Sequence, residues 1–296
     1  MRIPAIAALG ALLAMTTPAL AHEPLWGETP TIFGPGVFHP EIRFAFMRTG
    51  SASEPGETGN RALTQEYGLQ YGVNRWFNVR LTVPAAGMQI EQNLAGAVDR
   101  TTVSGIGDVL LEAKCRFHLV QEFGRQRSHA AIVGWKVPTG SDDAVAPDGT
   151  RLSPGMQAGT GHHGYEIGYA FDRETLRDTF WTSAVYHREI GDDFRRGDHL
   201  EIDAAYGRWV VRTNAMEKLG INLAFGLHGE ALGGDRLEGG VSAGNAHRFA
   251  GLQISPIITK GQTQFRVGLF VPLIKRGDED ENDFRYEVRA GWEAFF

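Results

Sequence analysis

The sequence contains a single cysteine, Cys115, among its 296 residues. An intramolecular disulfide is therefore excluded. Beyond residue 21 there is no apolar run of about 18 residues, which excludes a protein that crosses a membrane as helices. An excess of basic residues is also lacking, since the formal net charge is −6. Basic patches with interleaved aromatic residues are absent as well, so we expect no nucleic-acid partner.

The N-terminal residues have the features of a secretory signal peptide. Arg2 precedes an apolar run at 3–15, and a small-x-small cleavage site follows at 18–21. The run is too short to cross a bilayer. We therefore expect residues 1–21 to be removed as a signal peptide and residues 22–36, which are rich in proline and glycine, to form an N-terminal periplasmic segment. The sequence leaves open whether that segment closes the mouth of the protein or is disordered.

The last thirteen residues alternate between apolar and polar side chains, with Phe295 as the exception. The apolar set is Phe284, Tyr286, Val288, Ala290, Trp292, Ala294 and Phe296. Successive side chains of a strand point to opposite faces, so this pattern predicts a strand with one apolar and one charged face. A final strand with an outward aromatic band is typical of the closing strand of an outer-membrane barrel.

The same alternation recurs along the rest of the chain and predicts about twelve strands. Their approximate spans are 37–48, 62–73, 76–87, 107–119, 129–138, 164–172, 179–189, 198–209, 219–230, 248–259, 263–275 and 283–296. An even number places both termini in the periplasm. The predicted fold class is all-β: residues 37–296 form a single up-and-down antiparallel transmembrane β-barrel.

The lengths of the connections give independent support, because long and short ones alternate. Residues 49–61, 88–106, 139–163 and 231–247 are expected to be long outer loops, whereas connections such as 74–75 and 260–262 are short. This asymmetry is typical of an outer-membrane barrel. A soluble periplasmic β-protein is the alternative. Aromatic residues near predicted strand ends favour the barrel, because they suit the two membrane interfaces; they are Trp76, Phe77, Trp135, Phe180, Trp181, Trp209, Trp292 and Phe296.

Two short motifs resemble a known family. The segment 104–108, Ser-Gly-Ile-Gly-Asp, leads into a strand that contains 113–117, and residues 137–140 read Val-Pro-Thr-Gly before a long loop. Both are similar to segments of the outer-membrane proteins named for the meta-pathway of phenol degradation. The resemblance implies a barrel in the outer membrane of a Gram-negative bacterium, often described as a transporter. It brings no catalytic residue and no cofactor.

Charged residues on the inward face of the predicted strands are the candidate lumen-lining residues. They are Asp108, Glu112, Lys114, Arg116, Arg266, Arg285, Glu287 and Arg289. A twelve-stranded barrel is wider than the eight-stranded barrels that side chains can fill, so we expect a wet interior. For Asp108 we favour a role in capping the turn from loop to strand over contact with a solute.

The C-terminal strand also predicts partners. Trp292 and Phe296 are expected on its lipid face, where they assist barrel closure and assembly. The expected partners are therefore outer-membrane lipid, the barrel-assembly machinery acting on the last strand, and a small solute that the sequence does not identify.

Histidines raise the alternative of a metal site, which we do not expect. Adjacent His162 and His163 would point to opposite faces of a strand, and His22 stands alone at the mature N-terminus. An enzyme is not expected either. His118, His187 and His228 are predicted to point inward, away from a lipid substrate, and there is no G-x-S-x-G motif.

The sequence therefore predicts a porin-like channel or transporter for small solutes, aromatic or otherwise hydrophobic by the family resemblance. A structural barrel without transport is the alternative, followed by a lipid-modifying barrel enzyme.

Overall fold

The computed structural model describes residues 24–50, 58–94, 97–145, 157–191, 194–211, 219–234, 236–237, 240–241, 246–277 and 284–296. The predicted signal peptide, His22 and the acidic residues 278–281 lie outside this part of the chain. No helix within the described part is long and apolar enough to span a membrane.

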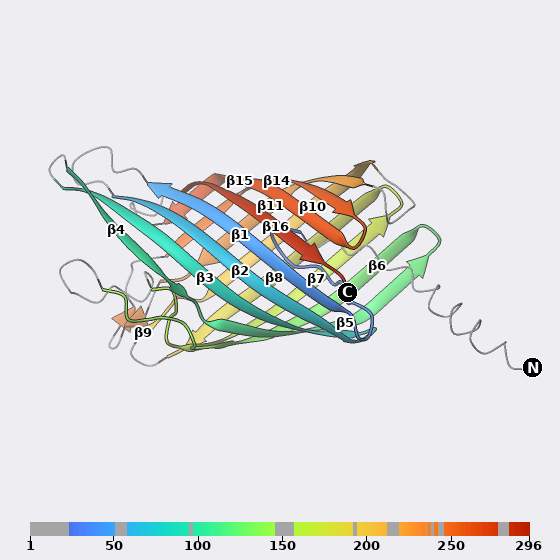
Figure 1. Cartoon of the computed structure of the whole chain (residues 1–296), viewed down its shortest axis with the longest axis horizontal. Helices are drawn as coiled ribbons and strands as arrows, with labels where there is room; N and C mark the ends of the chain where they lie inside the picture. Colours follow the sequence, from blue (N-terminus) through green and yellow to red (C-terminus); the bar gives the residue numbers. More distant parts are fainter. Residues whose placement is uncertain are drawn as a thin grey trace, which may run out of the picture.

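Twelve long strands form a closed antiparallel barrel (Figure 1). They are β1 (Phe38–Gly50), β2 (Thr58–Asn74), β3 (Phe77–Leu94), β5 (Val109–Glu122), β6 (Arg125–Val137), β7 (His163–Thr175), β8 (Asp178–Ile190), β10 (His199–Val211), β11 (Gly220–Leu232), β14 (His247–Lys260), β15 (Thr263–Gly277) and β16 (Phe284–Ala294). Each strand pairs with its neighbours in chain order, and β16 pairs with β1. The predicted fold class is confirmed.

The long connections contain further strands that the sequence pattern did not predict. Residues 88–106, expected to be a loop, extend β3 and add β4 (Ala97–Ile106), which pair as a hairpin from Ala85↔Ile106 to Leu94↔Ala97. Polar residues are frequent in this hairpin, so it lacks the apolar face by which the barrel strands were recognised. Short strands β9 (Phe194–Arg195), β12 (Arg236–Leu237) and β13 (Gly240–Val241) form a second small sheet.

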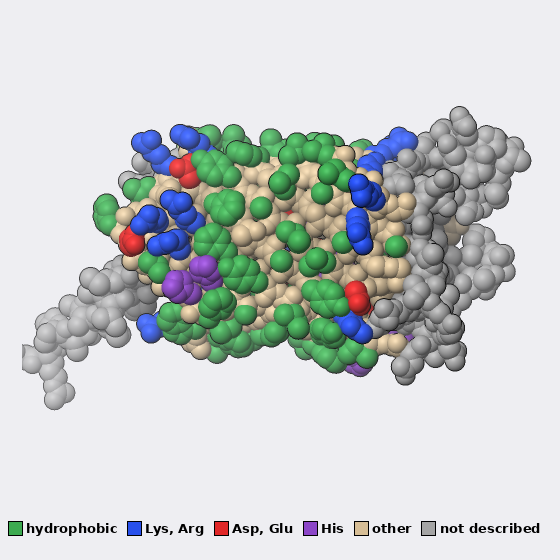
Figure 2. Space-filling view, turned by 180° about the vertical axis from the view of Figure 1, so that it is seen from behind, with side chains coloured by type: hydrophobic (Ala, Val, Ile, Leu, Met, Phe, Trp, Pro, Cys, Tyr) green, Lys and Arg blue, Asp and Glu red, His purple; other side chains and the backbone are tan. Residues whose placement is uncertain are grey.

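The barrel wall has an apolar outside and a polar inside, as the alternation requires. Large apolar side chains are exposed on the outer face, and they include Leu69, Val133, Ile167, Ile202, Phe225, Leu227, Ile254 and Leu269. Figure 2 shows hydrophobic side chains across the middle of one side, with Lys and Arg side chains gathered toward both ends. Charged side chains such as Glu112, Lys114 and Arg266 are buried inside.

The barrel closes between its first and last strands, as predicted. β1 and β16 are in register from Glu41↔Glu293 to Arg48↔Tyr286. The pairing continues past β16, because Phe296 N donates to the Phe38 carbonyl and Phe38 N donates to the Phe296 carbonyl, both at 3.0 Å. Trp292 and Phe296 are exposed on the outer surface.

The start of β16 departs from the predicted phase. The register steps from Arg48↔Tyr286 to Thr49↔Phe284, which leaves Arg285 without a partner residue across the strand pair. Such a bulge resets the alternation of side chains. Phe284 is consequently buried and Arg285 is exposed, so the predictions of a lipid-facing Phe284 and a lumen-lining Arg285 are wrong.

A second bulge changes the end of β5. The register shifts between Arg116 and His118, and His118 is exposed rather than inward. Among the aromatic residues, Trp76, Trp135 and Phe180 are exposed near strand ends as predicted, but Trp181 is buried. It packs inside the barrel; its cluster contains Ala205, Ala224 and Ile257.

Candidate functional site

The N-terminal segment lies inside the barrel. We call residues 24–33, which belong to the 22–36 segment expected to be periplasmic, the lumen segment. Leu25 and Trp26 are 2% and 0% exposed and belong to an apolar cluster with Phe270 and Phe284 of the inner wall. Trp26 Nε1 donates a hydrogen bond of 3.5 Å to Glu287.

Two glycines provide room for this segment. Gly27 has a φ of 78°, which favours glycine, and a Cβ there would lie 2.6 Å from Cβ of Asp203. On the facing wall, a Cβ at Gly268 would lie 2.3 Å from a ring carbon of Trp26. The close approach of the segment to the wall therefore depends on the absence of these side chains.

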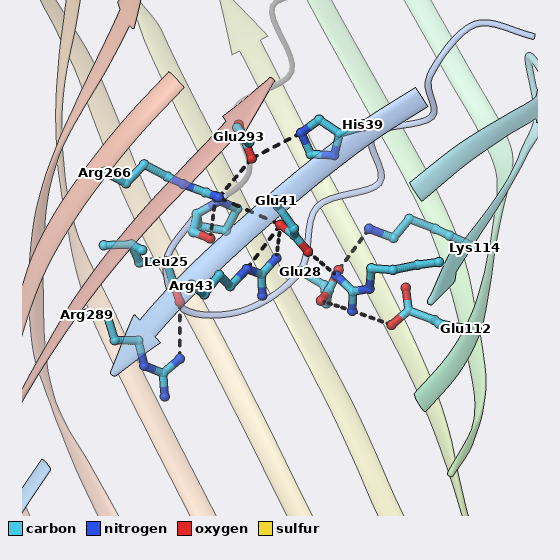
Figure 3. A network of polar contacts seen from close by, with 12 residues as sticks. Leu25, Glu28, His39, Glu41, Arg43, Glu112, Lys114, Arg266, Arg289 and Glu293 are labelled. Carbon is cyan, nitrogen blue, oxygen red and sulfur yellow. Dashed lines mark hydrogen bonds and ion pairs between the residues drawn. The ribbon is translucent and has the colours of Figure 1, made fainter. Parts of the chain in front are cut away.

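Glu28 anchors the segment through buried ion pairs (Figure 3). Its carboxylate lies 2.7 Å from Arg80 Nη2 and 2.8 Å from Lys114 Nζ. Burial alone would raise the pKa of Glu28, but the positive charges of Arg80 and Lys114 outweigh it and hold the pKa well below its usual range. Arg80 also pairs with Glu112, so β3 and β5 meet the segment at one charged centre.

Two further arginines hold the backbone of the segment. Arg266 Nη1 donates to the Pro24 carbonyl at 3.1 Å, and Arg289 Nη1 donates to the Leu25 carbonyl at 3.1 Å. Arg266 is itself held by Glu293 at 2.8 Å. The Arg289 guanidinium lies 5.2 Å from the centre of the Trp26 ring, a cation–π contact.

Most of the predicted lumen-lining residues meet at this segment, but not all. Glu112, Lys114, Arg266 and Glu287 are buried inside, and Arg289 is half-buried beside them. Arg116 is half-buried beside the turn between β2 and β3, where its Nη2 donates to the Arg75 carbonyl.

Several residues of this network were not among the predicted lumen-lining residues. Glu41, Arg80 and Glu293 are buried on the inner wall, and the alternation of their strands could have identified them. Glu28 had no such signal, because it lies in an irregular segment outside any strand.

Asp108 lies where β4 turns into β5 and fastens the long connection between β6 and β7. Its carboxylate accepts hydrogen bonds from Gly140 N at 3.0 Å and from Thr160 N and Oγ1 at 2.8 Å each. Lys136 Nζ lies 3.5 Å away. Although burial would raise the pKa of Asp108, the hydrogen bonds from Thr160 and Gly140 and the charge of Lys136 hold it below its ordinary value.

The replacement Asp108→Asn should loosen this connection, because an amide offers one acceptor oxygen instead of two. We expect a loss of about 2 kcal/mol of unfolding free energy at pH 7. Because the pKa of Asp108 is lowered in the folded protein, the extra unfolding free energy of the wild type is fully present at a pH above the ordinary pKa of an aspartate. It disappears as the pH falls through the pKa of Asp108 in the folded state. Urea unfolding of both proteins from pH 7 to pH 3 measures this; an equal difference at every pH would contradict it.

Two cavities lie in the barrel interior between the lumen segment and the long connections. One, of about 310 Å³, is lined partly by residues of the long connections, including Thr160 and Gly197. The other, of about 290 Å³, is floored by Leu25, Gly27 and Glu28. They share the wall residues Glu66, Thr82, Leu110, Glu166 and His187. The lumen is therefore hollow from the side of the long connections down to the lumen segment.

The inward histidines are paired with carboxylates. His228 Nδ1 lies 2.9 Å from Asp203 Oδ1, and both side chains are about 1% exposed. His187 Nδ1 lies 3.1 Å from Glu166 Oε2 beside the larger cavity. The predicted inward positions of His187 and His228 are confirmed.

Comparison with known proteins agrees with this architecture. A family model described as "Putative MetA-pathway of phenol degradation" matches residues 50–248. The COG4313 outer membrane channel from Pseudomonas putida F1 is similar in structure, with a TM-score of 0.66, 15% sequence identity, and coverage of 89% of this chain and 97% of that chain. The beta domain of the Bordetella autotransporter BrkA gives a TM-score of 0.47 and 10% identity over 88% of this chain and 100% of its own. No curated protein matches this chain.

The similarity to the Pseudomonas putida F1 channel and the order of the strands establish the fold as that of an outer-membrane β-barrel. They also confirm the family resemblance noted in the segments 104–108 and 137–140, both of which fall within the matched residues. Because the family model matches more than half of the sequence, the chain belongs to the family described as "Putative MetA-pathway of phenol degradation".

Proposed function

We propose that this barrel is a channel for small solutes and that the lumen segment narrows its path at the end where the short turns lie. The main support for the proposal is the pair of cavities that share wall residues, the smaller of which is lined by Leu25, Gly27 and Glu28 of the lumen segment. A barrel with a purely structural role would not require these cavities, so their presence favours transport. The similar Pseudomonas putida protein is described as a channel, which supports the same function.

The family description indicates the solute class, and the lumen wall indicates the polarity of the solute. That description refers to phenol degradation, so small aromatic compounds are the first solutes to test. The wall of the larger cavity carries both signs of charge, and its residues include Lys136, Arg188, Glu166 and Glu189. Such a wall suits water and a polar or ionised solute better than a neutral hydrocarbon, which favours an aromatic acid such as benzoate.

A structural barrel without transport is the second candidate. It is favoured by the ion pairs of Glu28 with Arg80 and Lys114, which hold the lumen segment across the interior. Buried pairs of this kind are costly to break. A permanently docked segment would leave no continuous path.

Reconstitution separates the two candidates. The mature chain in planar bilayers should give discrete conductance steps, and liposomes that contain it should take up benzoate faster than a neutral sugar of similar size. If neither the mature chain nor a chain that lacks residues 24–33 gives any conductance, the channel function is refuted and the structural role is left. Release of fatty acid from the lipid by purified protein would instead indicate an enzyme.

A further inference from the structure

Two histidines and a glutamate lie close together on the inner wall, although their spacing in the sequence does not match a metal-binding motif. The register of β8 and β10 places His199 directly opposite His187. Their rings stack with centroids 5.2 Å apart at an interplanar angle of 24°. Glu201 lies two residues after His199 and therefore on the same face of β10. One ligand atom from each of the three residues lies within 4.8 Å of the others.

The carboxylate of Glu166 is placed to support this group. Glu166 Oε2 lies 3.1 Å from His187 Nδ1, which leaves Nε2 of that ring as the donor for an ion. A carboxylate that holds the second nitrogen of a ligating histidine is a common support of metal sites. Glu230 Oε1 lies 2.9 Å from His199 Nε2, and His247 Nε2 lies 3.5 Å from the same oxygen. The same nitrogen of His199 lies 3.6 Å from Glu201 Oε1, so it faces the third member of the group.

The group also faces open space. His187 and His199 line the larger cavity, and His187 and Glu201 line the smaller one. An ion could therefore reach the site from the lumen and keep a water ligand on the cavity side. Two imidazoles and one carboxylate with an open position form a donor set that Zn²⁺ accepts readily.

We propose that His187, His199 and Glu201 bind a divalent transition-metal ion of the Zn²⁺ class on the inner wall of the barrel. The two imidazole nitrogens select such an ion over Ca²⁺ or Mg²⁺, which prefer oxygen ligands. The site revises the expectation of no metal site. That expectation considered spacing along the chain, whereas strand register joins residues from β8 and β10.

Titration of Zn²⁺ into the purified, folded mature barrel in detergent tests the proposal by calorimetry. We expect one ion per chain, and we expect His187→Ala and His199→Ala to weaken binding by about tenfold or more. Glu201→Gln keeps the size of the side chain and should weaken binding without disturbing the fold. Co²⁺ should give a visible absorption spectrum with the wild type that the His187→Ala variant lacks, and bound Zn²⁺ should raise the unfolding temperature.

The pair His118 and His129, of which His118 is exposed and His129 half-buried, provides the matched control. Their rings are 5.2 Å apart, as in the proposed site, but they lie on the outer surface. His118→Ala should therefore leave Zn²⁺ affinity unchanged. The proposal is overturned if the wild type binds no stoichiometric Zn²⁺, if Glu201→Gln and both alanine variants bind as the wild type does, or if His118→Ala alone abolishes binding. None of these measurements depends on conductance, so they remain informative even if the channel function fails.

Discussion

A chain that lacks residues 24–33 should conduct several times more current in planar bilayers than the complete mature chain. These residues fill the part of the lumen beside Arg266 and Arg289, which are bound to the Pro24 and Leu25 carbonyls. Their removal should replace a packed cluster with water and connect the smaller cavity to the barrel opening at the short turns. Single-channel recordings of both proteins at the same salt concentration measure the difference.

The barrel itself should survive this deletion. Arg80 keeps Glu112 as an ion partner, and the hydrogen bonds between β1 and β16 do not involve the deleted residues. The loss of Glu28 takes an ion partner from Lys114, but the deletion also lets water reach Lys114, so the loss of stability should be smaller than for an ion pair broken in a packed interior. Folded protein, identified by its resistance to denaturation in unheated detergent, should therefore be the sample used for recording.

A single substitution can displace the lumen segment without removing it. Gly268→Ala puts a Cβ where the nearest Trp26 ring carbon is only 2.3 Å away, so the ring must leave its position. Gly229→Ala is the matched control, because its Cβ would have no neighbour nearer than 3.7 Å. We expect Gly268→Ala to raise conductance or its fluctuations and Gly229→Ala to resemble the wild type. Identical recordings from the deletion, both glycine variants and the wild type would mean that the lumen segment does not limit the current.

The alternation of apolar and polar residues was sufficient to predict the twelve barrel strands. Each of them has one face against lipid and one against a polar interior, so a period of two is imposed along its length. The same period placed Glu112, Lys114 and Arg266 inside. It failed at Arg285 and His118, because each lies at a bulge that inserts one residue into the phase. Nothing in the composition of those strands marks where a bulge occurs.

The contents of the lumen were harder to predict than its wall. Glu28 and Trp26 lie in an irregular segment whose position is set by contacts with residues more than fifty positions away, such as Arg80 and Glu287. The His187 and His199 pair depends on the register between two strands. Periodicity reports which face a residue occupies but not which residue stands opposite it, so these groups require the three-dimensional structure.

Deletion of Phe296 should severely reduce the amount of folded barrel in the outer membrane, whereas the barrels that do fold should conduct as the complete chain does. Phe296 makes two backbone hydrogen bonds of 3.0 Å with Phe38, and these extend the seam between the last and first strands. Their loss leaves polar backbone groups unpaired at the closing edge. The aromatic side chain is 73% exposed on the outer surface, where the assembly machinery and lipid would meet it.

Phe296→Ala distinguishes the two contributions, because it keeps both backbone hydrogen bonds and removes only the ring. If the seam is decisive, this variant should assemble nearly as well as the wild type; if the ring is recognised during assembly, it should fail as the deletion does. Leu273→Ala is the control for the loss of an apolar outer side chain, since Leu273 is 63% exposed on β15. The measurement is the folded fraction in isolated outer membranes from cells that express each variant equally. Normal insertion of the chain that ends at Phe295 would show that closure of the barrel does not require its last residue.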